Sequence, residues 1–238
     1  MRTAAVAAFT FALLHGTAHA HPGDWGAVRG NGQKTTEIRE VPDFDAVALQ
    51  GAIDARVKVG GARTVAVTID ANLQPHVRIF VEDGRLVVRT EGEIDWRGEA
   101  RVEISVPALR DLSTSGSGDA SIEGGEGDLA LATSGSGDLL WHGRAGRLAV
   151  STSGSGDAVL SGRVQTLEAS TSGSGDLRAR DLSARDASIR TSGSGDVDVT
   201  LAGGSLRAVT SGSGDVTWGG EGSLAAAAAS GSGRIRRR

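Results

Sequence analysis

The chain of 238 residues contains no cysteine and no tyrosine, and it has only four tryptophans, four phenylalanines and four prolines. Without cysteine, the stability of the fold cannot rest on disulfides. With so few aromatic residues, the chain lacks the rows of stacking platforms that bind single-stranded nucleic acids. Its formal net charge of −4 gives no electrostatic reason to expect nucleic acid or an anionic membrane as a partner.

Long hydrophobic runs are also missing. The apolar stretch from Ala4 to Leu14 is too short to span a bilayer, which takes about 20 residues. It follows Met1-Arg2 and precedes Ala18-His19-Ala20, which is the pattern of a secretory signal peptide cleaved after Ala20. We therefore expect residues 1–20 to be a signal peptide, and the mature protein to be exported to the periplasm or the cell exterior without a transmembrane segment.

Glycine, in contrast, is abundant, and much of it lies in one repeated motif, Ser-Gly-Ser-Gly-Asp. A seventh copy ends in Arg234 instead of Asp. The spacing between copies is constant, except for one additional residue between the fourth and the fifth. So constant a period indicates one supersecondary unit stacked on copies of itself. The copies begin at Ser115, Ser134, Ser153, Ser172, Ser192, Ser211 and Ser230.

Apolar residues stand at alternate positions on both sides of each motif, such as Leu148 and Val150 before one copy and Ala158 and Leu160 after it. This period of two predicts strands with one buried face. A 19-residue unit of short strands predicts an all-β fold, a parallel β-helix or β-solenoid of six to seven rungs about 4.8 Å apart. The alternation places the preceding Thr and both glycines of each motif inward, and both serines and the Asp outward.

Residues 36–108 contain short alternating runs without the motif, and residues 82–85 carry a hairpin signal. We predict that this β-rich N-terminal part covers the first rung of the solenoid, because exposed sheet edges need covering. The predicted domains are the signal peptide, a flexible leader at 21–35, the N-terminal part at 36–108, the repeat solenoid at 109–233 and a basic tail at 234–238.

Several short segments come in a fixed order before the repeats: Phe44-Asp45-Ala46-Val47, Gly51-Ala52-Ile53-Asp54-Ala55-Arg56-Val57 and Val106-Pro107-Ala108-Leu109. Together with the repeats, over roughly residues 37–233, they resemble the bacterial head GIN domain, a domain of unknown function labelled as an auto-transporter adhesin. The resemblance implies an exported β-solenoid with no established ligand. It supplies no catalytic residue.

Stacked rungs would bring the motif aspartates into a column. Neighbouring unit charges about 4.8 Å apart repel by roughly 0.9 kcal/mol in bulk water, so another interaction must offset this. Hydrogen bonds from backbone N–H groups in the turns are one candidate, and bound Ca²⁺ is the alternative. Ca²⁺ takes about six to eight oxygen ligands, so we favour the structural turn and assign no cofactor. The aspartates, which are the only candidate metal ligands, are Asp119, Asp138, Asp157, Asp176, Asp196 and Asp215.

The last copy of the motif differs from the others. Arg234 takes the place of Asp, and we expect it to lie against Asp215 and to end the acidic column. With residues 236–238 it would discourage end-to-end stacking of solenoids. The alternative is a solvated basic tail.

Residues suited to catalysis form no pattern typical of an enzyme. His76 and His142 lack catalytic or metal-binding spacing, and the serines lack a nucleophile-elbow context. Trp141 and Trp218 occupy equivalent inward positions, which favours core packing over a sugar-stacking platform. We expect a non-enzymatic module that binds a surface polysaccharide or an envelope protein, or a structural envelope protein. A polysaccharide-active β-helix enzyme is the remaining alternative.

Overall fold

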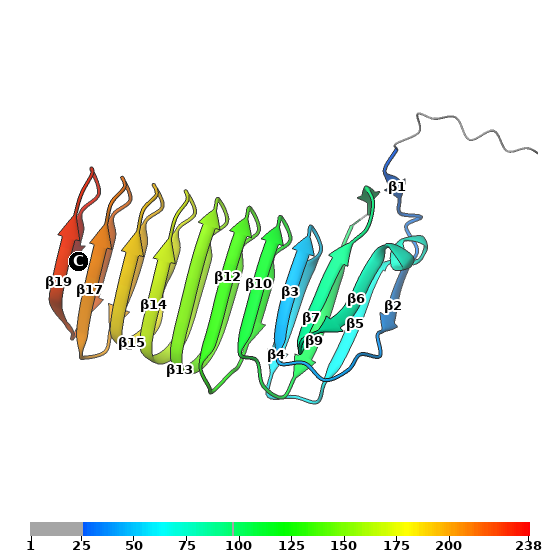
Figure 1. The fold of residues 1–238 in the computed structure, drawn as a ribbon, viewed down its shortest axis with the longest axis horizontal. Coiled ribbons are helices and arrows are strands. Elements are labelled where there is room, and N and C mark those ends of the chain that lie inside the picture. Colours follow the sequence, from blue (N-terminus) through cyan, green and yellow to red (C-terminus); the bar gives the residue numbers. More distant parts are fainter. Residues whose placement is uncertain (1–25, 97) are drawn as a thin grey trace, which may run out of the picture.

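The computed structural model describes residues 26–96 and 98–238, and the predicted signal peptide lies outside them. The described chain is almost entirely β-strand and forms a solenoid of about seven turns, which confirms the predicted fold class (Figure 1). The elongated solenoid carries its repeated turns along one edge.

Each repeat contributes two strands that meet at its Ser-Gly-Ser-Gly-Asp turn. Strands before the turns form a leading wall, and strands after the turns form a trailing wall, both with parallel, in-register pairing. The leading wall includes β10 (Asp111–Gly116), β12 (Leu129–Gly135), β17 (Ser205–Thr210) and β19 (Ser223–Ala229). The trailing wall includes β11 (Ala120–Glu123), β16 (Val197–Leu201), β18 (Val216–Gly220) and β20 (Ile235–Arg237). Three strands turn the corner and belong to both walls: β13 (Leu139–Gly154), β14 (Ala158–Thr171) and β15 (Leu177–Thr191).

The core lies between the two walls and consists of side chains stacked rung upon rung. Leu148 pairs in register with Leu129 and Leu167, and the threonines before the turns form a second buried column. Trp141 and Trp218 are 1% and 5% exposed, which confirms that they pack in the core. A fully buried leucine contributes about 1.5–3 kcal/mol to folding, so these columns dominate the stability of the solenoid.

The two glycines of each motif stack on their equivalents in the next rung. An ideal Cβ added to Gly156 would lie 2.1 Å from the carbonyl oxygen of Gly137, and one added to Gly154 would lie 2.1 Å from that of Gly135. The second glycine is buried as predicted, but the prediction that the first faces inward is wrong, because it lies half-exposed at the turn. Each glycine is required by the closeness of the adjacent backbone.

The one longer step between motif copies, from Ser172 to Ser192, is absorbed as a β-bulge. Val159 pairs with Arg178, and Ser161 pairs with Asp181. Between these two pairs β14 advances by two residues and β15 by three. The extra residue therefore bends β15 locally and leaves the turns in register.

The N-terminal part contains solenoid rungs of its own. β3 (Ala46–Gly51) and β4 (Asp54–Val59) lie between the first motif rung and a rung made of β7 (Arg85–Thr90) and β9 (Arg101–Val106), as Figure 1 shows. The spatial order of these rungs thus differs from their sequence order. Residues 46–59 and 85–106 extend the solenoid, which goes beyond the predicted role of a cover.

Antiparallel strands complete this end of the molecule. β2 (Lys34–Ile38) pairs with β5 (Thr64–Asp70), β5 pairs with β9, and β6 (Val77–Glu82) pairs with β7. The predicted hairpin at 82–85 is confirmed, and Asp83 and Gly84 both have the positive φ of a type I′ turn (50° and 73°). The leader predicted to be flexible contains β1 (Val28–Arg29), which pairs with β8 (Ile94–Asp95), and the start of β2.

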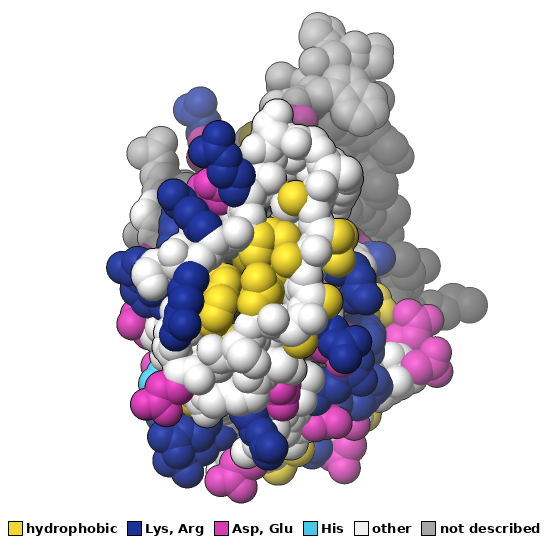
Figure 2. Space-filling model, turned by 90° about the vertical axis from the view of Figure 1, so that its left-hand side faces the viewer, with side chains coloured by type: hydrophobic (Ala, Val, Ile, Leu, Met, Phe, Trp, Pro, Cys, Tyr) yellow, Lys and Arg dark blue, Asp and Glu magenta, His cyan; other side chains and the backbone are white. Residues whose placement is uncertain are grey.

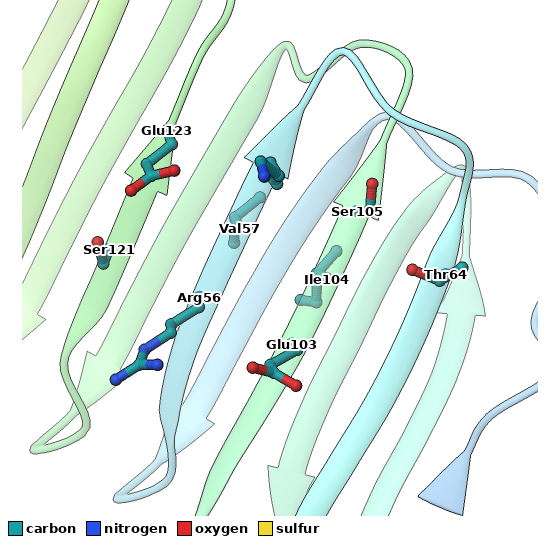
Figure 3. Close-up of a pocket in the computed structure, with 9 residues that line it drawn as sticks. Arg56, Val57, Thr64, Glu103, Ile104, Ser105, Ser121 and Glu123 are labelled. Carbon is teal, nitrogen blue, oxygen red and sulfur yellow. The ribbon is translucent and has the colours of Figure 1, made fainter.

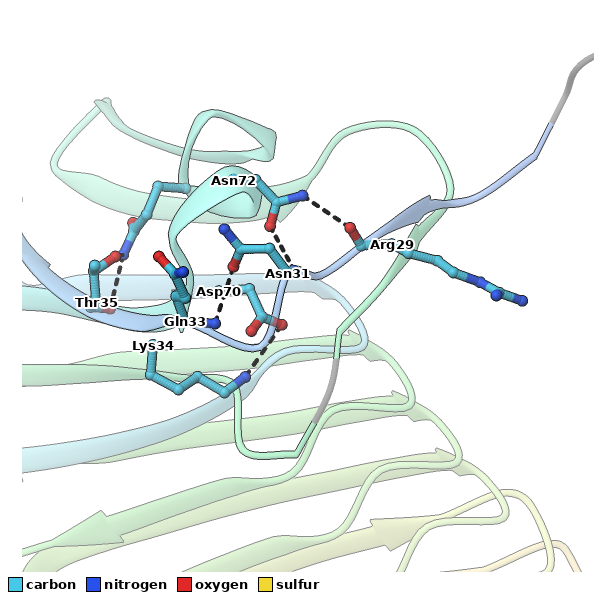
Figure 4. Close-up of polar contacts among 8 residues, drawn as sticks. Arg29, Asn31, Gln33, Lys34, Thr35, Asp70 and Asn72 are labelled. Atoms are coloured by element: carbon cyan, nitrogen blue, oxygen red, sulfur yellow. Dashed lines mark hydrogen bonds and ion pairs between the residues drawn. The ribbon is translucent and has the colours of Figure 1, made fainter.

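A polar cluster fastens the short 3-10 helix η1 (Ala71–His76) and β2 to the solenoid (Figure 4). The fully buried Asp70 forms an ion pair with Lys34 at 3.3 Å. The side chain of Asn72 accepts a hydrogen bond from the N–H of Asn31 and donates one to the carbonyl of Arg29. These contacts join residues 36 to 43 positions apart in the sequence, so they hold residues 29–34 against the end of β5 and η1.

The basic C-terminal residues are bound to the solenoid. The Arg234 N–H donates to Asp215 Oδ1 at 2.9 Å, whereas the ion pair to Asp215 comes from Arg236, at 3.7 Å. Arg234 therefore lies against Asp215 as expected, and the contact is made by its backbone N–H. Arg237 stacks over the Trp218 ring at 4.8 Å.

The C-terminal end of the solenoid exposes apolar side chains. Figure 2 looks onto this end, and hydrophobic side chains gather at its centre with basic side chains around them. Leu224 is 41% exposed, and residues 225–229, all alanine, are exposed as well.

Across the described ranges, no helix is long and apolar enough to cross a membrane.

Candidate interaction surfaces

The motif aspartates form a hydrogen-bonded column along the edge of the solenoid. Oδ1 of each Asp accepts a hydrogen bond from the backbone N–H of the equivalent residue one rung further on, at 2.8–2.9 Å between motif copies. The column begins one rung earlier than the motif, because Asp54 accepts from the N–H of Asp119 at 3.0 Å. The geometry supports the structural-turn interpretation: each carboxylate joins two rungs.

Arginines on the trailing wall provide counter-charges to this column. Arg178 donates to Oδ2 of Asp157 at 2.6 Å and to Oδ2 of Asp176 at 3.0 Å. The hydrogen bond to Asp157 raises the pKa of the Arg178 guanidinium above its ordinary value. Among the described residues, no group of three or more His, Asp or Glu side chains could hold a metal ion.

Replacing Asp157 by alanine is expected to destabilise the fold by about 1.5–2 kcal/mol, since the Asp176 N–H loses a charged acceptor. The Asp157→Asn variant keeps an acceptor oxygen and should lose less than half of that amount. Urea unfolding of both variants measures the difference. Equal stability of Asp157→Ala and the parent protein would contradict the role given to the column.

Adding Ca²⁺ after EDTA treatment is expected to leave the melting temperature unchanged. The reason is that Oδ1 of each motif Asp already accepts a backbone hydrogen bond, and one carboxylate per rung falls short of the oxygens that Ca²⁺ requires. Thermal unfolding by circular dichroism tests this, with Mg²⁺ as the control cation. A rise specific to Ca²⁺ would instead establish the aspartates as metal ligands, because binding to the folded state alone raises stability.

Both serines of every motif copy lie at the surface, as predicted, and form two columns of hydroxyl groups beside the aspartates. The outer surface of the leading wall continues from them. Over successive rungs its outward residues are small apart from Asp111 and Glu168 at the two ends of one row. We name the small residues of this surface the Ala/Ser face: Ser113, Ala130, Ala132, Ala149, Ser151 and Ser170.

The Ala/Ser face contains a shallow hollow of about 300 Å³. Glu168 and Arg190 lie at its border, and Arg147 forms an ion pair with Glu168 at 2.5 Å, which raises the pKa of Arg147. Floor residues with short side chains lose little rotamer entropy when a ligand covers them. The face can therefore hold a flat, extended ligand, and it offers hydroxyls at the spacing of the rungs.

A second hollow of about 430 Å³ lies outside the trailing wall where it meets β9 and β5 (Figure 3). Arg56 is paired in register with Glu103, and Lys58 with Glu123. Each carboxylate thus has a cation on the adjacent strand, and the hollow has no excess of either charge. The ion pairs at this hollow run to other residues, since Arg56 lies 3.9 Å from Glu99 and Glu103 lies 3.2 Å from Arg101.

The histidines named in the sequence analysis lie apart from each other. His76 Nδ1 is 3.2 Å from the carbonyl oxygen of Glu91, and His142 Nδ1 is 3.0 Å from Ser161 Oγ. Within the described ranges, no carboxylate lies within ion-pair distance of His142, so the Ser161–His142 pair lacks the third member of a hydrolytic triad there.

The repeat predicts the columns of motif serines and aspartates, whereas the Ala/Ser face was not predicted from the sequence. The alternation had already marked residues such as Ala132 and Ser151 as outward. Their small size over successive rungs was the signal that could have identified the face.

Comparisons with known proteins give a consistent description. The family model described as "putative auto-transporter adhesin, head GIN domain" matches residues 43–222. A "putative adhesin" from Bacteroides fragilis is 21% identical with a TM-score of 0.82, over 89% of this chain and all of that one. A "putative lipid binding protein" from Parabacteroides distasonis is 23% identical with a TM-score of 0.67, over 90% of this chain and all of that one. Likeness at this identity shows the fold alone. No curated protein matches the chain.

Proposed function

Because the chain belongs to the head GIN domain family of "putative auto-transporter adhesins", we propose that it is an exported, non-enzymatic adhesion module. The proposed ligand is a surface polysaccharide, which is an extended polymer. The alternative partner is an envelope protein. The calcium-stabilised form of this proposal is disfavoured, because the motif aspartates serve the backbone of the next rung.

The observation that carries the proposal is the Ala/Ser face. It lies on consecutive strands β10, β12, β13 and β14, so it repeats the same small residues and backbone geometry at steps of about 4.8 Å. A repetitive ligand can make the same weak contact at several rungs at once, and linked contacts strengthen binding far beyond any single one. A small molecule would gain little from so shallow a surface.

Sedimentation of the mature protein with a panel of insoluble or immobilised polysaccharides tests the proposal. The Ser151→Gln variant places a long neutral side chain on the Ala/Ser face and should weaken binding at least about tenfold, or about 1.4 kcal/mol. Leu140→Gln, on the outer surface of the trailing wall, is the matched control and should bind like the parent. Binding that Ser151→Gln leaves intact would rule out this face as the binding site.

A further inference from the structure

Two arginines, Arg144 and Arg163, stand side by side at the corner between the two walls. Arg144 lies in β13 and pairs in register with Arg163 in β14, so their Cα atoms are about one rung apart. Both residues are exposed. Like charges in register on neighbouring strands repel each other, so this arrangement is unfavourable unless an anion lies between or above them.

Other arginines that reach across rungs have acidic partners. Arg180 forms an ion pair with Asp198 at 3.2 Å, for example, as Arg178 does with two motif aspartates. Neither Arg144 nor Arg163 has a carboxylate within ion-pair distance in the part of the chain that the structure describes. Further arginines share this property, but none of them pairs in register with another arginine: Arg190, Arg207, Arg234 and Arg237.

A hollow of about 510 Å³ lies beside the arginine pair, and its floor is made of glycine. A Cβ on Gly143 would lie 2.3 Å from the carbonyl oxygen of Gly124, and one on Gly162 would lie 2.0 Å from that of Gly143. The close contact between these rungs therefore requires glycine at positions 143 and 162, and neither position adds a side chain to the hollow. A ligand can approach the backbone closely there.

The border of the hollow adds further polar groups. His142, which is hydrogen-bonded to Ser161, lies on one side, and Ser183 follows Arg163 in register on the next rung. Glu126 also lines the hollow and contributes one negative charge against two guanidinium groups. The balance is positive, in a chain whose formal net charge is −4.

We propose that this hollow binds the oxoanion groups of an acidic polysaccharide, such as uronate carboxylates or sulfate esters, through Arg144 and Arg163. The inference rests on the proposed function and names the class of its ligand. Guanidinium groups bind carboxylate and sulfate oxygens with two parallel hydrogen bonds, and two of them along the solenoid axis can hold successive anionic groups of one polymer. The hollow and the Ala/Ser face share strands β13 and β14, so one polymer can contact both.

Equilibrium binding of the mature protein to polygalacturonate, dextran sulfate and neutral dextran tests this inference. The acidic polymers should bind more tightly than dextran, and added salt should weaken their binding. The double variant R144Q/R163Q should lose about tenfold or more in affinity for the acidic polymers, because charged hydrogen bonds are removed. The matched control R234Q/R237Q removes two arginines that also lack a carboxylate partner among the described residues. Both lie outside the hollow and the Ala/Ser face, so this variant should lose less than threefold. An unchanged melting temperature for each variant verifies its fold.

Each other outcome has a definite meaning. If both double variants lose the same affinity for the acidic polymers, the loss reflects the net charge of the protein and not this hollow, and the inference is overturned. Suppose that inorganic sulfate or phosphate competes with the polymer as strongly as the polymer's own anionic groups do, counted per group. That result would make the hollow a small-anion site and overturn the assignment to a polymer. Equal binding of acidic and neutral polymers, unaffected by R144Q/R163Q, would overturn this inference and leave the proposed function standing. No binding to any polysaccharide, acidic or neutral, would contradict both.

Discussion

Replacing Gly156 by alanine is expected to destabilise the protein by about 3 kcal/mol or more, at the upper end of overpacking effects. The added Cβ would lie 2.1 Å from the carbonyl oxygen and 2.8 Å from the carbonyl carbon of Gly137. Both atoms belong to backbone held in the stack, so neither can move as a flexible side chain would. Gly156 lacks a positive φ, and the expected loss therefore comes from the contact between rungs alone. Urea unfolding at constant m-value measures it.

Gly127→Ala is the matched control for this substitution. No atom lies within 4 Å of a Cβ at Gly127, and its φ is not positive. The same chemical change should therefore be neutral there, or stabilise by about 0.4–1 kcal/mol through the lower entropy of the unfolded chain. A small loss at Gly156, similar to the effect at Gly127, would mean that the rungs can separate locally.

Replacing Trp141 by alanine is expected to cost about 3–5 kcal/mol, the range for removing a large buried aromatic side chain. Trp141 is 1% exposed and lies in the centre of the trailing wall between Ile122 and Leu160. The loss is large because alanine would leave a cavity in the core between Ile122 and Leu160. Chemical denaturation gives the change in unfolding free energy.

Two further variants separate burial from chemistry at this position. Leu140→Ala changes the adjacent residue, which is 44% exposed, and should shift stability by no more than about 0.5 kcal/mol. Trp141→Phe keeps most of the ring volume and removes an indole N–H that is buried without a hydrogen-bond partner among the described residues, so it should cost under about 1.5 kcal/mol. A loss of polysaccharide binding in folded Trp141→Phe would contradict its assignment to the core.

The repeat made most of the solenoid predictable. The constant period of the motif places each Thr, Ser and Asp above its equivalent, and the alternation decides which of them are buried. The orientation of the first glycine was missed, because alternation describes only inward and outward directions. The Cβ direction of Gly154 instead lies along the stack, toward Gly135.

The N-terminal rungs could not be placed from the sequence. Residues 51–54 supply the same glycine and aspartate positions as a motif copy, yet Ala52 and Ile53 replace the serine and second glycine, so the segment does not read as a repeat. The Arg144–Arg163 pair was also missed. The two arginines are recognisable as neighbours only once the register is known, and the glycine floor beside them depends on the corner geometry.

The spatial order of the N-terminal rungs has a consequence for how the chain folds. Ala46 pairs with Arg85 on one side and with Asp111 on the other, both far along the chain, whereas each later rung pairs with the repeat that directly follows it. Longer loops lose more entropy on closure, and contacts distant in sequence slow folding. β3 and β4 therefore stay unpaired on both edges until residues 85–123 are available to pair with them. The repeats can then add one at a time onto a finished template.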